Sequence, residues 1–94
     1  MNESQLKTKA LAWLRAQPET WVVKIHGGPM GSAGVPDLLC CVRGAFLAIE
    51  LKSPTSTGKP TPSQAVVGTR IRAAGGLWLV ARSLDEVRDA WDSA

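Results

Sequence analysis

The sequence predicts an α/β fold in which helices cover a mixed sheet, in the order αβββαβα. Helix-like and strand-like apolar periodicities alternate along the 94 residues in that order. Two of the expected strands, 35–42 and 45–52, are apolar on both faces, which is typical of a sheet covered on both sides. We expect one domain spanning residues 1–94. Its core should be modest, because a chain this short buries only roughly 60–65% of its unfolded surface.

The first helix is expected to begin after Asn2, with Gln5 as its capping-box partner. An apolar stripe at helical spacing follows, and Pro18 cannot continue the helix. The stripe consists of Leu6, Ala10, Trp13 and Leu14. Residues 21–25 favour a first strand, and a Gly-rich loop over 26–34 leads from it to the two apolar strands.

The second half begins with the polar segment "SPTSTGKPTP", whose composition is typical of a loop. Thr61 can cap the helix that follows, with Gln64 completing a capping box. The expected buried stripe of this helix is Val67, Ile71 and Ala74. Residues 77–81 favour a fourth strand. Another capping box begins a short terminal helix, with Ser83 and Glu86 as its members.

The charge of the chain is unevenly distributed. The net charge is +3, but residues 1–84 carry ten Lys and Arg against four acids, a balance of +6. A basic body suits a polyanion such as nucleic acid, and a solvated basic surface is the alternative. No apolar run approaches the roughly 20 residues of a membrane span, so we expect no membrane association and a cytoplasmic protein. Cys40 and Cys41 are then expected to be buried, reduced thiols.

Three charges interrupt the two apolar strands at the open end of their hairpin. A two-residue turn at Arg43-Gly44 places Asp37 opposite Glu50, and Lys52 shares their face. Two opposed carboxylates repel each other, and a hard divalent cation such as Mg²⁺ or Mn²⁺ would compensate. A cross-strand ion pair at a solvated sheet end is the alternative. The neighbouring Gly-rich loop favours chemistry, because glycines let a large ligand approach the backbone.

These residues resemble a known nuclease motif. "GVPD", with thirteen residues from its Asp to the Glu of "ELK", resembles the PD-(D/E)xK motif. The helix with Glu3, "GVPDLL", "AIELK", "TPSQ" and "RIRAAGGLWLVARSLDEVRDAW" together resemble the VRR-NUC family over nearly the whole chain. That family is similar to restriction endonucleases and Holliday-junction-resolving nucleases, and phages or prophages encode many of its members. The resemblance implies a restriction-endonuclease-like αβββαβ core with a short C-terminal helix. For a phage-encoded protein it implies action in the bacterial host cytoplasm.

The resemblance also implies roles for individual residues. Asp37 and Glu50 would ligate Mg²⁺ or Mn²⁺, and the backbone carbonyl of Leu51 would be a further ligand. Lys52 would position the attacking water and stabilise the transition state. Glu3 would hold a metal-bound water, with a first-turn acid that favours the helix dipole as the alternative.

The same resemblance gives Gln64 a place in the site, and the alternative is its role in the capping box of Thr61. Four basic residues are candidates for DNA contacts: Lys59, Arg70, Arg72 and Lys24. The sequence thus predicts a metal-dependent DNA endonuclease that acts as a homodimer on branched DNA such as four-way junctions. The alternatives are a non-catalytic nucleic-acid-binding module that retains the nuclease fold, and a small interaction protein with a basic surface.

Overall fold

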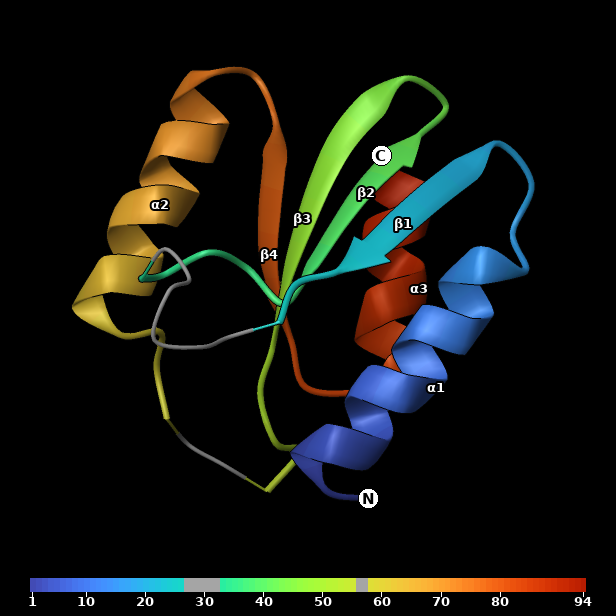
Figure 1. Cartoon of the computed structure of the whole chain (residues 1–94), viewed down its shortest axis with the longest axis horizontal. Coiled ribbons are helices and arrows are strands. Elements are labelled where there is room, and N and C mark those ends of the chain that lie inside the picture. The colour runs from blue at the N-terminus through green and yellow to red at the C-terminus, as the bar shows by residue number, and fades with distance from the viewer. Residues whose placement is uncertain (27–32, 56–57) are drawn as a thin grey trace.

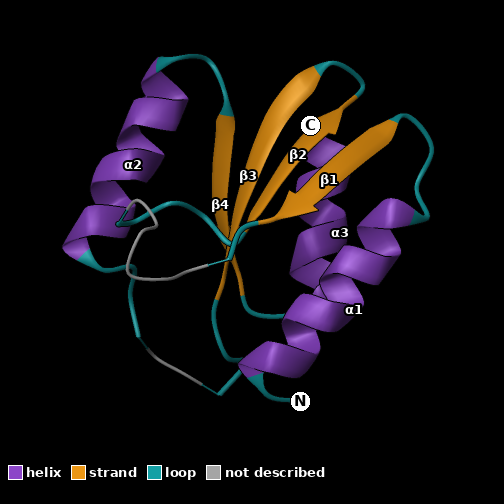
Figure 2. Cartoon of the chain, in the orientation of Figure 1, coloured by secondary structure: helices purple, strands orange, loops and turns teal. Residues whose placement is uncertain are grey.

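A computed structural model describes residues 1–26, 33–55 and 58–94, and most of the expected Gly-rich loop lies outside these ranges. The described elements follow the order αβββαβα, which confirms the prediction (Figures 1 and 2). They are α1 (Glu3–Arg15), β1 (Thr20–Lys24), β2 (Leu38–Val42), β3 (Ala45–Leu51), α2 (Pro62–Ala73), β4 (Leu77–Ala81) and α3 (Leu84–Ser93). None of the helices in these ranges has the length and apolar character needed to cross a bilayer.

The four strands form one mixed sheet in the order β1-β2-β3-β4. The first two pairs are antiparallel, whereas β3 and β4 run parallel. The end of β3 and the end of β4 therefore meet at the same edge of the sheet as the beginning of β2 (Figure 2). The end of β1 also lies here, because Lys24 pairs with Leu38, so four segments of the chain leave or enter the sheet at this edge.

The hairpin turn between β2 and β3 has the predicted register. Its central residues, Arg43 and Gly44, both have positive φ, 49° and 84°, as a two-residue type I′ turn requires. Left-handed backbone is unusual for an arginine, and contacts of its side chain hold it there. The Arg43 guanidinium donates hydrogen bonds to the carbonyls of Trp91 and Ala94 and lies 4.3 Å from the Trp91 ring centroid. The turn is thereby fastened to the end of α3.

The core lies on the face of the sheet that α1 and α3 cover (Figure 1). Three of the four residues of the predicted α1 stripe are fully buried there, and Trp13 packs against their edge. The strands contribute alternate residues, because side chains one position apart point to opposite faces. The largest of these buried strand residues are Leu38, Leu47, Ile49 and Leu51.

Among the described elements, α2 is the one on the opposite face of the sheet, where it packs on β4. The contact depends on Gly68, where a Cβ atom would lie 2.3 Å from the Trp78 ring. Gly68 is buried, whereas Ala74 is exposed and Val67 and Ile71 are only half-buried, so the predicted stripe of this helix was wrong in part. Close approach of backbone to ring, rather than a row of large apolar side chains, holds α2 in place.

Because α2 packs mainly on β4, a row of side chains across the other strands is left uncovered by the described helices. Trp21, Cys41 and Phe46 are aligned across β1, β2 and β3 on this face. Trp21 is 66% exposed and Phe46 45% exposed. Cys41 is also exposed, so the expectation that both cysteines are buried was wrong for Cys41 and right for Cys40. The expected cover on both faces of the sheet is likewise incomplete.

The predicted capping residues begin all three helices. Asn2 with Gln5 and Thr61 with Gln64 form reciprocal capping boxes. The third box is incomplete, because the Glu86 carboxylate accepts from the backbone N–H of Arg82. The cap of α2 matters most for the site, because Gln64 takes part in both.

Candidate active site at the open end of the hairpin

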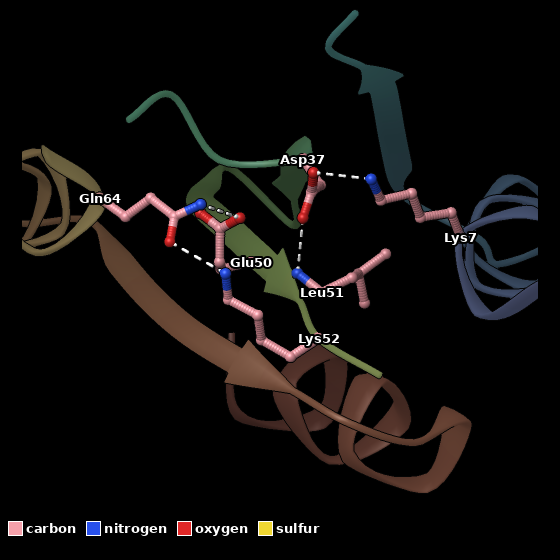
Figure 3. A network of polar contacts seen from close by, with 6 residues as sticks. All are labelled: Lys7, Asp37, Glu50, Leu51, Lys52 and Gln64. Atoms are coloured by element: carbon pink, nitrogen blue, oxygen red, sulfur yellow. Dashed lines mark hydrogen bonds and ion pairs between the residues drawn. The ribbon is translucent and has the colours of Figure 1, made fainter. Parts of the chain in front are cut away.

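Asp37 lies one residue before β2, at the edge where β3 ends. Its backbone carbonyl accepts a hydrogen bond from the backbone N–H of Ile25 at 2.9 Å. This bond extends the pairing of β1 with β2 by one step. Its carboxylate Oδ2 accepts from the backbone N–H of Leu51 at 2.7 Å, and Oδ1 lies 3.3 Å from Nζ of Lys7 (Figure 3). The paired ladder ends at Leu38 and Ile49, so Asp37 lies one position beyond it, in the register that places it opposite Glu50, and its carboxylate is held against the end of β3.

Glu50 is the buried acid of the site, with only 2% of its surface exposed. Its Oε1 accepts from Nε2 of Gln64 at 3.1 Å. Its Oε2 is buried, and no group in the described ranges donates a hydrogen bond to it. Burial raises the pKa of Glu50 to about 8, with a further contribution from the neighbouring Asp37 carboxyl, while the charges of Lys52 and Lys7 oppose the rise. The site thus contains a buried carboxyl group with one oxygen that has no hydrogen-bond donor among the described residues.

Lys52 and Gln64 are joined on the α2 side of the carboxylates (Figure 3). Nζ of Lys52 donates to Oε1 of Gln64 at 3.0 Å, and the same oxygen accepts from the backbone N–H of Thr61 at 2.9 Å. One amide therefore caps α2, holds the ammonium of Lys52 and donates to Glu50. The two interpretations of Gln64 that the sequence left open, helix cap and site residue, are compatible.

The first helix contributes Lys7 to the site, a residue that the sequence analysis missed. Glu3, the residue expected there, is half-buried at the start of α1, and within the described ranges no hydrogen bond or ion pair joins it to the carboxylates. Lys7 lies four positions later, one helical turn away on the same face. That spacing was the signal available in the sequence. If the helix face with Glu3 is turned toward the site, Lys7 on the same face is turned toward it as well.

The four candidate DNA-binding residues lie in different environments. Lys59 is exposed in the connection before α2, and Arg70 is exposed on α2 itself. Arg72 donates to the backbone carbonyl of Trp78 at 2.9 Å and lies 5.2 Å from the centroid of its ring, so its guanidinium already has a structural contact. Lys24 is half-buried at the end of β1, next in the sheet to the beginning of β2.

The donor atoms at this edge fit a hard divalent ion. The described residues hold no cluster of three His, Cys, Asp or Glu side chains, so a site for a softer metal is not built here. Mg²⁺ is commonly bound through one or two carboxylates and keeps several waters, and Asp37 with Glu50 supplies the two carboxylates. The unpartnered Oε2 of Glu50 is an oxygen that such an ion could take.

No family model matches the chain, and no curated protein matches it. Solved structures do match it, among them the following two. One, described as "VRR_NUC domain", is 26% identical with a TM-score of 0.75, over 96% of this chain and 94% of that one. The other, described as "VRR_NUC domain protein", is 22% identical with a TM-score of 0.74, over 98% of this chain and 86% of that one. The chain has the VRR_NUC fold.

The VRR_NUC fold is a nuclease fold, and the match spans nearly the full length of the chain. This structural match agrees with the resemblance to the VRR-NUC family that the sequence motifs indicated. It also accounts for the mixed sheet with the parallel β3–β4 pair.

Proposed function

We propose that this chain is a deoxyribonuclease that hydrolyses phosphodiester bonds with the help of Mg²⁺ or Mn²⁺. One observation carries the proposal: at the open end of a hairpin, next to a second carboxylate, Glu50 has a buried carboxylate oxygen to which no described residue donates a hydrogen bond. Burying such a group costs roughly 1–3 kcal/mol, so a folded protein keeps it where a ligand compensates. The VRR_NUC fold supports the same conclusion.

Asp37 and Glu50 would hold the metal, with the backbone carbonyl of Leu51 as a further ligand and Glu3 acting through a water. When bound, the ion lowers the pKa of its water and neutralises charge on the phosphate. The chain's own contribution is orientation. The N–H of Leu51 fixes Asp37, and the Gln64 amide holds the Lys52 ammonium beside Glu50, where it stabilises negative charge on the attacked phosphate.

The proposed substrate is branched DNA such as a four-way junction, cut by a two-fold homodimer. The uncovered apolar row on the sheet supports assembly, because Trp21 and Phe46 would leave water in a symmetric interface. A junction has two symmetry-related strands to cut, and a dimer presents two sites in fixed relation. Lys59, Arg70 and Lys24 are the proposed phosphate contacts, with Arg72 as a weaker candidate because of its bond to Trp78.

The test is a cleavage panel on single-stranded, duplex, flap and four-way-junction DNA, with Mn²⁺, Mg²⁺, Ca²⁺ or chelator. Ionic strength must be fixed, because a basic protein loses DNA affinity steeply as salt rises. Asp37→Asn, Glu50→Gln and Lys52→Met should each abolish most cleavage and remain folded. Asp92→Asn, an exposed acid on α3, is the matched control.

Cleavage that persists in chelator would overturn the metal proposal. DNA binding without cleavage under every metal would favour the alternative, a binding module that keeps the nuclease fold. Light scattering gives the mass of the assembly. A monomer that nicks linear duplex and junction equally would contradict the junction proposal while leaving the metal chemistry intact.

A further inference from the structure

We propose that Lys7 couples metal binding to DNA binding: its ammonium neutralises Asp37 in the metal-free protein, is displaced by the divalent ion, and then binds a DNA phosphate. The inference rests on the proposed metal site and assigns a role to a residue that no part of that site requires. It concerns positioning and charge, and gives Lys7 no part in bond breaking.

The geometry places Lys7 on the oxygen that a metal would need. Asp37 has two carboxylate oxygens, and Oδ2 is held at 2.7 Å by the backbone N–H of Leu51, a group fixed at the end of β3. Oδ1 is the oxygen left for a cation, and Nζ of Lys7 lies 3.3 Å from it. An ammonium and a divalent ion at one oxygen repel each other strongly at such distances. The two cations therefore compete for Asp37.

The two lysines of the site flank the carboxylates from opposite sides (Figure 3). Lys52 is held by a neutral amide oxygen of Gln64, so a metal on the carboxylates does not take its partner. Lys7 is held by a carboxylate oxygen, so a metal does. Of the two ammonium groups, Lys7 is the one that metal binding releases.

The charge count gives the released ammonium a new partner. With a divalent ion bound and both carboxylates ionised, the charges of Asp37, Glu50, Lys7, Lys52 and the ion sum to +2, which attracts the phosphodiester backbone. The freed ammonium would remain on the α1 side of the carboxylates, close to a phosphate that the metal attracts. Metal and DNA then favour each other's binding, and this coupling is reciprocal.

The ion pair is weak enough to exchange. The side chains of Lys7 and Asp37 are 29% and 19% exposed, so water screens the pair. Such partly exposed pairs contribute about 0.2–1 kcal/mol, and the upper part of that range corresponds to roughly two- to five-fold in a binding constant. Lysine is also a flexible four-carbon side chain that can swing between two oxygen partners without movement of α1.

The test compares Lys7→Met with Lys9→Met. Both variants remove one positive charge from α1, and Lys9 is exposed two positions away, on another face of the helix. Mn²⁺ affinity is measured by calorimetry without DNA. Affinity for a labelled four-way junction is measured by fluorescence anisotropy in chelator and in Ca²⁺, at one ionic strength. Lys7→Arg, which retains the charge, is the rescue variant.

The proposal expects Lys7→Met to bind Mn²⁺ about two- to five-fold more tightly than wild type, and Lys9→Met to bind it equally. In chelator the two variants should bind DNA alike. In Ca²⁺, Lys7→Met should bind DNA about two- to five-fold more weakly than Lys9→Met. Lys7→Arg should restore the wild-type pattern in both measurements.

Other outcomes separate the two proposals. If Lys7→Met binds Mn²⁺ more weakly, Lys7 only positions Asp37 and the inference is wrong. If the two variants bind DNA alike in Ca²⁺ as well, Lys7 contacts no phosphate and the inference is also wrong; in both cases the nuclease proposal stands. If wild type binds no divalent ion and Asp37→Asn behaves identically, the proposed function fails and the coupling fails with it.

Discussion

Gln64 has two tasks that mutation can separate. Its Oε1 accepts from both Thr61 N–H, which caps α2, and Lys52 Nζ, while its Nε2 donates to Glu50. Thr61 carries the other half of the capping box, since its Oγ1 accepts from the N–H of Gln64 at 3.2 Å. Thr61→Ala therefore removes a cap bond alone. Gln64→Ala removes the reciprocal cap bond together with both contacts to the site.

The expected loss of stability in each variant follows from the number of hydrogen bonds that it removes. Loss of an N-cap side chain costs about 1 kcal/mol, which applies to Thr61→Ala. Gln64→Ala loses a similar amount at the cap and leaves Lys52 and Glu50 without a partner. Hydrogen bonds to charged groups contribute about 1.5–3 kcal/mol each when buried, and partial exposure of Lys52 lowers its share. We expect Gln64→Ala to cost about 2 kcal/mol more than Thr61→Ala. In a domain of this size 1 kcal/mol shifts Tm by roughly 4–8 °C.

The assay pairs thermal unfolding with single-turnover cleavage, both well below the melting temperature of the weaker variant. Thr61→Ala should keep nearly the wild-type rate. Gln64→Ala should lose about ten- to a hundred-fold in kcat, because misplaced site groups cost this much. The loss should fall on kcat rather than KM. If the two variants match in both Tm and kcat, Gln64 is a helix cap and nothing more.

Protonation, backbone packing and assembly can each be tested separately. The pKa of Glu50 is raised from 4.5 to about 8, so the stability of the metal-free protein should be fully present below pH 4.5 and fall as pH rises to about 8. Thermal unfolding should show this fall in wild type and not in Glu50→Gln. At Gly34 (φ 83°) an added Cβ would lie 2.3 Å from the Ser63 carbonyl oxygen, whereas Gly75 (φ 94°) faces open space. Gly34→Ala should therefore lower Tm and cleavage more than Gly75→Ala, and equal losses would mean that backbone strain alone matters. Trp21→Ser should reduce the mass seen by light scattering, and an unchanged dimer would contradict the proposed interface.

Much of the fold could be predicted because its signals are local. The caps at Asn2 and Thr61 depend on residues three positions apart. The hairpin register depends on one turn, Arg43-Gly44, and each pair outward from it follows by counting. The location of the carboxylates at the open end of the hairpin followed from the same count.

What the sequence did not reveal depends on contacts between distant segments. Lys7 contacts Asp37 because α1 packs under the sheet, and its four-residue spacing from Glu3 was the only local signal of that contact. Strand alternation predicts which residues share a face of the sheet. Whether a helix covers that face depends on how distant segments pack, so the exposure of Cys41 was missed. The burial of Gly68 was not predicted, because a helical stripe is recognised from its large apolar residues. The contact with Trp78 instead requires a residue without a side chain.

At Glu50, the stability of the metal-free chain and the proposed nuclease activity favour different residues. A carboxyl group that is buried with one unpartnered oxygen destabilises the metal-free chain, and an apolar residue of similar size would fill the same space without that cost. A search for heat-resistant variants of this protein, run without metal or DNA, should therefore enrich replacements such as Glu50→Met. The most stable descendants of this chain would be well-folded proteins with the same sheet and no site.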